Sequence, residues 1–117
     1  MPSEPEKIEI RVSAEFKRSL RTLSKRYRSV RSDIQPIIER LQSGEVMGDR
    51  ISGTGYAIFK VRVKNSDIQK GKSGGYRFIY YLKTSTQVLL ITLYSRSDQG
   101  DVSPLSVNKI VASFESS

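Results

Sequence analysis

The stretch that decides the fold is residues 70–81, KGKSGGYRFIYY. Its first half is basic and rich in glycine. Because glycine tolerates positive φ, this half predicts a sharp turn or a close approach of the backbone to a ligand. The second half alternates as a β-strand does, with Arg77 and Tyr81 on one face and Phe78 and Tyr80 on the other. One arginine is thereby fixed on a stiff element beside a basic loop.

The Gly71-Lys72-Ser73 triplet resembles part of a nucleotide-binding P-loop, but the rest of that motif is missing. A P-loop has another glycine five positions earlier, and Ser66 stands there. The motif also opens a helix, whereas residues 76–83 are β-branched and aromatic. We therefore expect no nucleotide cofactor.

Composition narrows the possible functions. A chain of 117 residues with 37% hydrophobic and 27% charged residues is most simply one soluble domain. Twenty Lys and Arg against twelve Asp and Glu give a net charge of +8, which favours a polyanionic partner, nucleic acid before an anionic membrane. The chain contains no cysteine and no histidine, which excludes disulfides, thiolate or imidazole metal sites and a Ser-His-Asp triad. We expect neither a metal nor a cofactor.

The two ends of the expected domain are read from the same sequence. Residues 1–6 predict a loose tail before a domain of residues 7–117. The N-terminus carries Glu4 and Glu6 and lacks the apolar segment of a signal peptide. The most apolar run, residues 88–94, is too short to span a bilayer. These features predict a cytoplasmic protein that does not enter a membrane.

Periodicity predicts the N-terminal half of the chain. Residues 7–12 alternate as a short strand. Ser13 is a plausible N-cap of a helix, and the helical apolar stripe that follows ends at Val30. A capping box at Ser32, with Pro36 within or just after the first turn, predicts the start of a second helix that Gly44 ends. Two helices joined by so short a break predict a helix hairpin.

The C-terminal half predicts three antiparallel strands and a last helix. The strands are residues 56–64, 76–83 and 87–96, and glycines mark the segment before them as a loop. Ser103 and Pro104 fit the N-cap and first residue of a short helix that reaches Phe114. The fold class is therefore α+β: one domain with an antiparallel β-sheet, an N-terminal helix hairpin packed on one face and a short C-terminal helix.

The strands carry cations on one face. If Phe59, Phe78 and Ile91 face the helices, the opposite face presents a mixture of cations and tyrosines: Lys60, Arg62, Arg77, Tyr81, Tyr94 and Arg96. Neighbouring cations repel one another, so such a face should be either wet or in contact with an anion. An ordinary hydrophilic sheet face is the alternative. The mixture, without an acidic partner in these strands, favours a nucleic-acid surface.

This order of elements and several motifs resemble the RelE-type toxins of bacterial toxin–antitoxin pairs, especially their HigB-like branch. The resemblance runs from Ile8 onward and is most specific in residues 70–81; the pair Lys60 and Arg62 and the motif at residues 93–96, LYSR, add to it. It implies an mRNA interferase, a metal-independent endoribonuclease that cuts messenger RNA on the ribosome. It also implies a cognate antitoxin protein as a partner, besides ribosome and mRNA.

The same resemblance implies the site. Lys60, Arg62, Arg77 and Arg96 match the catalytic cations of the family, and we assign RNA contacts to Lys64, Lys70, Lys72, Tyr81 and Tyr94. Neighbouring cations would disfavour the charged form of Lys60 and so help it to act as a base. The arginines would stabilise phosphate charge, and the tyrosines could stack on bases.

Two alternatives remain open at this point. The related ParE toxins share the fold and poison gyrase without cutting RNA, and a basic RNA-binding domain would have a similar composition. The tyrosine that some RelE members carry after the sheet has Ser103 at about its place here, with Tyr94 as a candidate substitute. The basic residues on the strands favour the nuclease.

Overall fold

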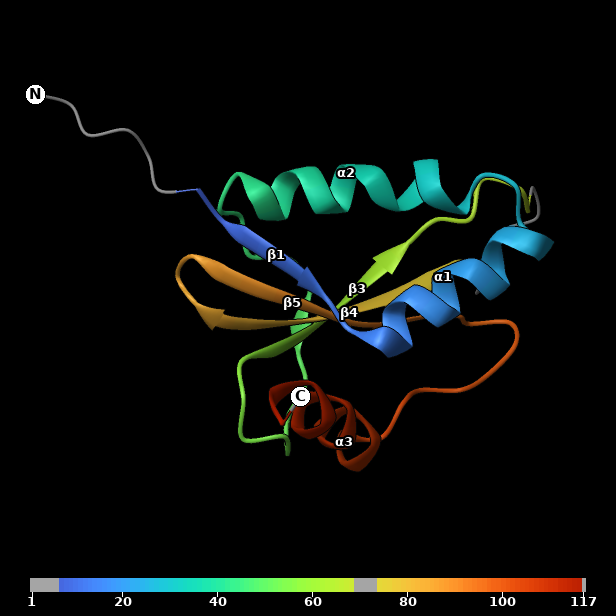
Figure 1. Ribbon diagram of the computed structural model, residues 1–117. Coiled ribbons are helices and arrows are strands. Elements are labelled where there is room, and N and C mark those ends of the chain that lie inside the picture. The colour runs from blue at the N-terminus through green and yellow to red at the C-terminus, as the bar shows by residue number, and fades with distance from the viewer. Residues whose placement is uncertain (1–6, 69–73, 117) are drawn as a thin grey trace, which may run out of the picture.

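The computed structural model describes residues 7–68 and 74–116 (Figure 1). The expected tail at residues 1–6 therefore lies outside the described residues, as do Lys70 and Lys72. In chain order the elements are β1 (Glu9–Val12), α1 (Ala14–Arg26), α2 (Val30–Gln42), β2 (Asp49–Arg50), β3 (Ile58–Val63), β4 (Tyr76–Thr84), β5 (Gln87–Ser95) and α3 (Pro104–Glu115).

The described strands form one five-stranded sheet in the order β1-β5-β4-β3-β2. β1 runs parallel to β5, and the other neighbouring strands are antiparallel. Figure 1 shows α1 and α2 on one side of this sheet and α3 on the other. The predicted α+β class is confirmed. The short strand β2 was expected to be loop, and β1 joins the sheet by pairing with the last strand in the sequence.

The first core lies between the sheet and the two N-terminal helices. Phe16 of α1 meets Phe78 of β4 edge to face, with ring centroids 5.3 Å apart, and both rings are buried. The predicted N-cap is confirmed, since the Ser13 hydroxyl accepts a hydrogen bond of 3.0 Å from the Phe16 N–H. The same hydroxyl donates to the Ile91 carbonyl at 2.6 Å, which ties the start of α1 to the centre of the sheet.

The break between α1 and α2 falls earlier than the sequence predicts. α1 ends at Arg26, and Val30 is the buried first residue of α2, so the predicted helix start at Ser32 is wrong. Ser29 is the N-cap residue of α2, and a residue 38 positions away holds it in place: the Asp67 carboxylate accepts hydrogen bonds from the Ser29 N–H at 2.8 Å and from its hydroxyl at 3.1 Å. Pro36 then lies inside α2 and is exposed.

A β-bulge in β5 changes which side chains share a face. Ile79 lies opposite Thr92 while Tyr80 lies opposite Leu90, so Ile91 is an extra residue on β5. An extra residue breaks the alternation of a strand. Ile91 consequently packs in the core beneath α3 rather than beside Phe78, and the expectation that it faces the helix hairpin is wrong.

The second core lies beneath α3 and covers part of the face that the sequence predicts to be open. Val107 and Val111 of α3 pack in one cluster with Ile58, Ile79 and Ile91, all fully buried. The Ser103 hydroxyl accepts a hydrogen bond from the Ser106 N–H, which confirms the predicted N-cap of α3. No helix in the described ranges is both long and apolar enough to cross a membrane.

Candidate nucleic-acid interface

Near the N-terminus of α3, the predicted cations come together on β3, on β4 and just after β5. We call them the cationic cluster: Lys60, Arg62, Arg77 and Arg96. Arg62 of β3 and Arg77 of β4 are direct cross-strand partners. Arg96 follows β5, and its N–H donates to the Gly75 carbonyl at 2.9 Å. Like charges directly opposite one another destabilise a sheet. Within residues 7–68 and 74–116 none of these arginines forms an ion pair, so the cluster has unused positive charge.

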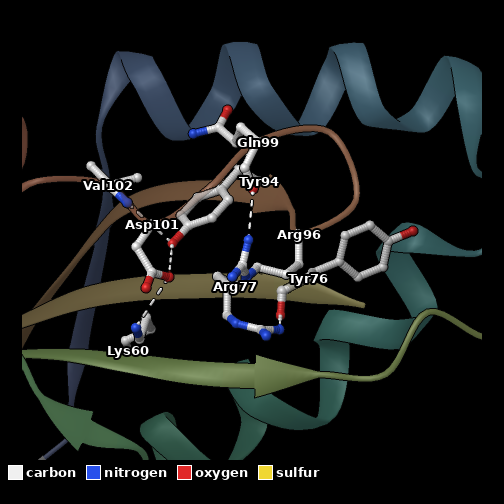
Figure 2. A network of polar contacts seen from close by, with 8 residues as sticks. All are labelled: Lys60, Tyr76, Arg77, Tyr94, Arg96, Gln99, Asp101 and Val102. Carbon is white, nitrogen blue, oxygen red and sulfur yellow. Dashed lines mark hydrogen bonds and ion pairs between the residues drawn. The ribbon is translucent and has the colours of Figure 1, made fainter. Parts of the chain in front are cut away.

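The arginine head groups are held by single backbone contacts (Figure 2). Arg77 Nη1 donates a hydrogen bond to the Tyr76 carbonyl at 3.2 Å. Arg96 Nη1 donates one to the Gln99 carbonyl at 3.4 Å. A guanidinium has five N–H donors, so each group keeps donors for an anion. Such a fork can hold a phosphate through two hydrogen bonds.

One carboxylate stands among these cations. Lys60 Nζ lies 3.3 Å from Asp101 Oδ1, and the Tyr94 hydroxyl lies 3.5 Å from the same oxygen (Figure 2). The pKa of Asp101 is lowered, first by the hydrogen bond and charge of Lys60 and then by the charges of Arg96 and Arg77. Asp101 is therefore negatively charged at neutral pH and marks a position where the cluster already holds an anion.

Sequence reasoning missed Asp101. Strands β3, β4 and β5 themselves contain no acidic partner for these cations, and Asp101 lies in the loop between β5 and α3. The only available signal was an acidic residue shortly before the N-cap Ser103, in a loop that must return the chain across the sheet.

Tyr94 belongs to the cluster through its hydroxyl alone. Its side chain is only 5% exposed, so the ring is not free to stack on a base. Burial raises the pKa of Tyr94. This rise is opposed by a hydrogen bond of 3.4 Å from the Val102 N–H to the Tyr94 hydroxyl and by the charges of Arg77 and Arg96. The hydroxyl is therefore protonated at neutral pH and lies beside Asp101.

The structure does not bring Tyr81 to the cluster. Tyr81 lies further along β4, opposite Leu89, and its ring meets Tyr56 edge to face with centroids 5.3 Å apart. Burial and the nearby charge of Glu115 raise the pKa of Tyr81. The expected convergence of both tyrosines with the cations is therefore found for the Tyr94 hydroxyl and not for Tyr81.

A pocket of about 310 Å³ adjoins the cluster at the ends of β3 and β4, and we call it the Asn65 pocket. Its lining shares two cations with the cluster and adds a third: Arg62, Lys64 and Arg77, with Val63, Asn65, Ile68, Gly74 and Gly75. Among the described residues, the lining holds no acidic side chain. The predicted RNA contact Lys64 is exposed at this pocket.

Together these groups can bind and stabilise a phosphodiester. They offer guanidinium donors, an ammonium and a phenolic hydroxyl within one region of the sheet. In the part of the chain that the structure describes, no group of His, Cys, Asp and Glu side chains could hold a metal ion.

Comparison with known proteins supports the fold. No protein-family model matches the chain. Among solved structures, the chain is similar to the E. coli toxin RelE, in a form with two arginines replaced by alanine and in the free state. The similarity has a TM-score of 0.55 at 16% sequence identity and covers 92% of this chain and 96% of that one. The chain therefore has a RelE-like fold along most of its length.

Proposed function

We propose that this protein is the toxin of a toxin–antitoxin pair, from the HigB-like branch of the RelE-type toxins, and that it cuts messenger RNA on the ribosome in the cytoplasm. Its partners would be the ribosome with its mRNA and a cognate antitoxin that blocks it. The observation that supports this best is the cationic cluster itself, in which Arg62 faces Arg77 without a carboxylate between them. A bound anion would offset the repulsion between these two arginines and so stabilise the site.

The chemistry we assign needs no metal. The 2′-hydroxyl of the RNA attacks the adjacent phosphorus, the bond from phosphorus to the 5′-oxygen breaks, and the products are a 2′,3′-cyclic phosphate and a 5′-hydroxyl. Arg77 and Arg96 stabilise the extra negative charge of the pentavalent phosphate, because guanidinium stays protonated and donates in pairs. Lys60 is the group we assign to proton transfer, with the Tyr94 hydroxyl beside it.

The ribosome supplies what this site lacks. The cluster holds no histidine, and its proton-transfer groups ordinarily have pKa values far above neutrality. Such a site is a modest catalyst by itself. Holding the mRNA so that the 2′-oxygen, phosphorus and 5′-oxygen lie in line would provide a large part of the rate. We therefore assign translated mRNA, rather than free RNA, as the substrate.

The test is to express the protein and map the new 5′ ends of one mRNA with and without its start codon. We expect cuts only in the translated form, together with growth arrest. Growth arrest without cuts in either form, accompanied by inhibited DNA supercoiling, would establish the gyrase-directed alternative. RNA binding without cuts or toxicity would leave a basic RNA-binding domain.

A further inference from the structure

The Asn65 pocket is a second place for an anion, next to the one that Asp101 marks. Arg62, Lys64 and Arg77 line it, and none of the lining residues within 7–68 and 74–116 is acidic. At about 310 Å³ it can admit a phosphate group with part of a nucleotide. The pocket is thus a basic concavity that shares Arg77 with the assigned cleavage chemistry and adds Lys64 and Asn65, which that chemistry does not use.

One wall of the pocket, formed by the segment that begins at Asn65, is hydrogen-bonded to the N-terminus of α2. Asn65 Oδ1 accepts the Asp67 N–H at 2.9 Å, and both Asp67 carboxylate oxygens accept hydrogen bonds from Ser29. The Asp33 carboxylate of α2 accepts the Ser66 N–H at 3.0 Å. These bonds fix residues 65–67 before any ligand arrives, which reduces the ordering cost of binding.

The opposite wall, at Gly75, is constrained by a close approach of two backbone segments. Gly75 has φ of +88°, and a Cβ built there would lie 2.5 Å from the Val63 carbonyl oxygen. Only glycine therefore allows β3 and β4 to approach this closely at the mouth of the pocket. The two walls make a preformed site.

Asn65 carries a donor that lacks a partner. The residue is 2% exposed, and its Nδ2 forms no hydrogen bond with any residue that the structure describes. The bond from Asp67 to Oδ1 fixes which end of the amide is the donor. A buried donor without an acceptor is costly, and a phosphate oxygen entering the pocket would provide one.

We infer that the Asn65 pocket binds a second phosphodiester of the RNA, adjacent to the one that is cut, through Lys64 and the Asn65 amide. This rests on the proposed function and names a further contact with the same substrate. Side chains on one face of a strand repeat about every 6.6 Å, a step comparable to that between neighbouring phosphates of an extended RNA. Lys60, Arg62 and Lys64 occupy three positions separated by two such steps along β3 and its end.

The experiment uses ribosomes programmed with an mRNA that has one neutral methylphosphonate beside the cleaved position, on either side in separate substrates. With the wild-type protein, we expect one of these substrates to be cut about tenfold less efficiently, through a higher KM, than the unmodified mRNA. Lys64→Ala should lose the same factor on unmodified mRNA and become insensitive to the methylphosphonate. Lys64→Arg should restore both, and Lys17→Ala, an exposed lysine on α1, should behave as the wild type.

A second variant tests the buried amide. Asn65→Asp keeps an oxygen acceptor for the Asp67 N–H and replaces the donor with a group that repels phosphate. If it melts like the wild type, we expect a larger loss than for Lys64→Ala. Equal cutting of all three substrates, or full sensitivity in Lys64→Ala, would overturn the inference. Absence of any cut in unmodified translated mRNA would instead overturn the proposed function.

Discussion

One face of the sheet behaves differently at its two ends, although the same strands build both. At the end that α3 covers, β3, β4 and β5 contribute Ile58, Ile79 and Ile91, each fully buried. At the other end the same strands contribute Lys60, Arg62 and Arg77, and Arg96 follows. The covered end stabilises the fold, whereas the cationic end adds repulsion to it. Charges that the fold does not need are free to bind an external anion.

The β-bulge marks the boundary between the ends. It places Ile91 and Thr92 consecutively on the α3 side, so that Tyr94 points toward Asp101 rather than into the hairpin core. Without the extra residue the alternation of β5 would send Tyr94 to the opposite face. A local irregularity in one strand therefore sets the composition of the candidate site.

The largest effect on stability should come from the covered end. Ile79→Ala removes a fully buried side chain from the α3 core and should lower the free energy of unfolding by about 2–5 kcal/mol. Urea denaturation measures this. Arg77→Ala, two residues earlier on the same face of β4, is the matched control and should change the free energy of unfolding far less. Equal losses in the two variants would mean that the two ends do not differ as described.

An intermediate effect on stability is expected where the start of α1 is hydrogen-bonded to the β-bulge of β5. Ser13→Ala removes both the N-cap of α1 and the hydrogen bond to the Ile91 carbonyl. It should cost about 1–2 kcal/mol of stability, as N-cap losses do. The comparison is thermal melting of Ser19→Ala, in which a serine within α1 loses a hydrogen bond of 3.3 Å from its hydroxyl to the Glu15 carboxylate. A Ser13→Ala protein as stable as that control would contradict the fastening role.

A smaller effect should appear at the cationic end when its internal anion is removed. Asp101→Asn should raise affinity for RNA or ribosomes severalfold at low salt, because the carboxylate beside Lys60 competes with phosphate. Asp98→Asn is the matched control: it lies in the same loop and changes the net charge equally, but its partner is Arg26 of α1, at 2.7 Å. Filter binding across a salt series measures both. Identical shifts would show that only net charge matters.

The sequence predicts those parts of the fold that depend on local periodicity. Three such features follow from neighbours in the chain: the alternation at residues 76–83, the N-caps Ser13 and Ser103, and the cations on one face of β3. The hydrogen bonds from Ser29, the N-cap residue of α2, to Asp67 do not, because they join residues 38 positions apart. The proximity of Asp101 to Lys60 likewise exists only once the loop after β5 has returned across the sheet.

The face assignment was partly wrong for a related reason. Alternation cannot reveal a bulge, since an extra residue leaves the hydrophobic pattern of β5 almost unchanged. The sequence also could not indicate how far α3 extends over the sheet, because its apolar stripe fits any apolar surface. The alternation therefore predicts a face that is open along its whole length, and part of that face is a second core.

The most direct test of the central claim is the rate at which Arg77→Ala cuts translated mRNA, measured beside its thermal melting. Arg77 lies on the sheet opposite Arg62, donates a hydrogen bond to the Tyr76 carbonyl and forms no ion pair within the described residues. If its charge serves the transition state, cleavage should fall by about 10²–10³-fold while the melting temperature stays near that of the wild type. A variant that melts like the wild type and cuts mRNA at the wild-type rate would contradict the account.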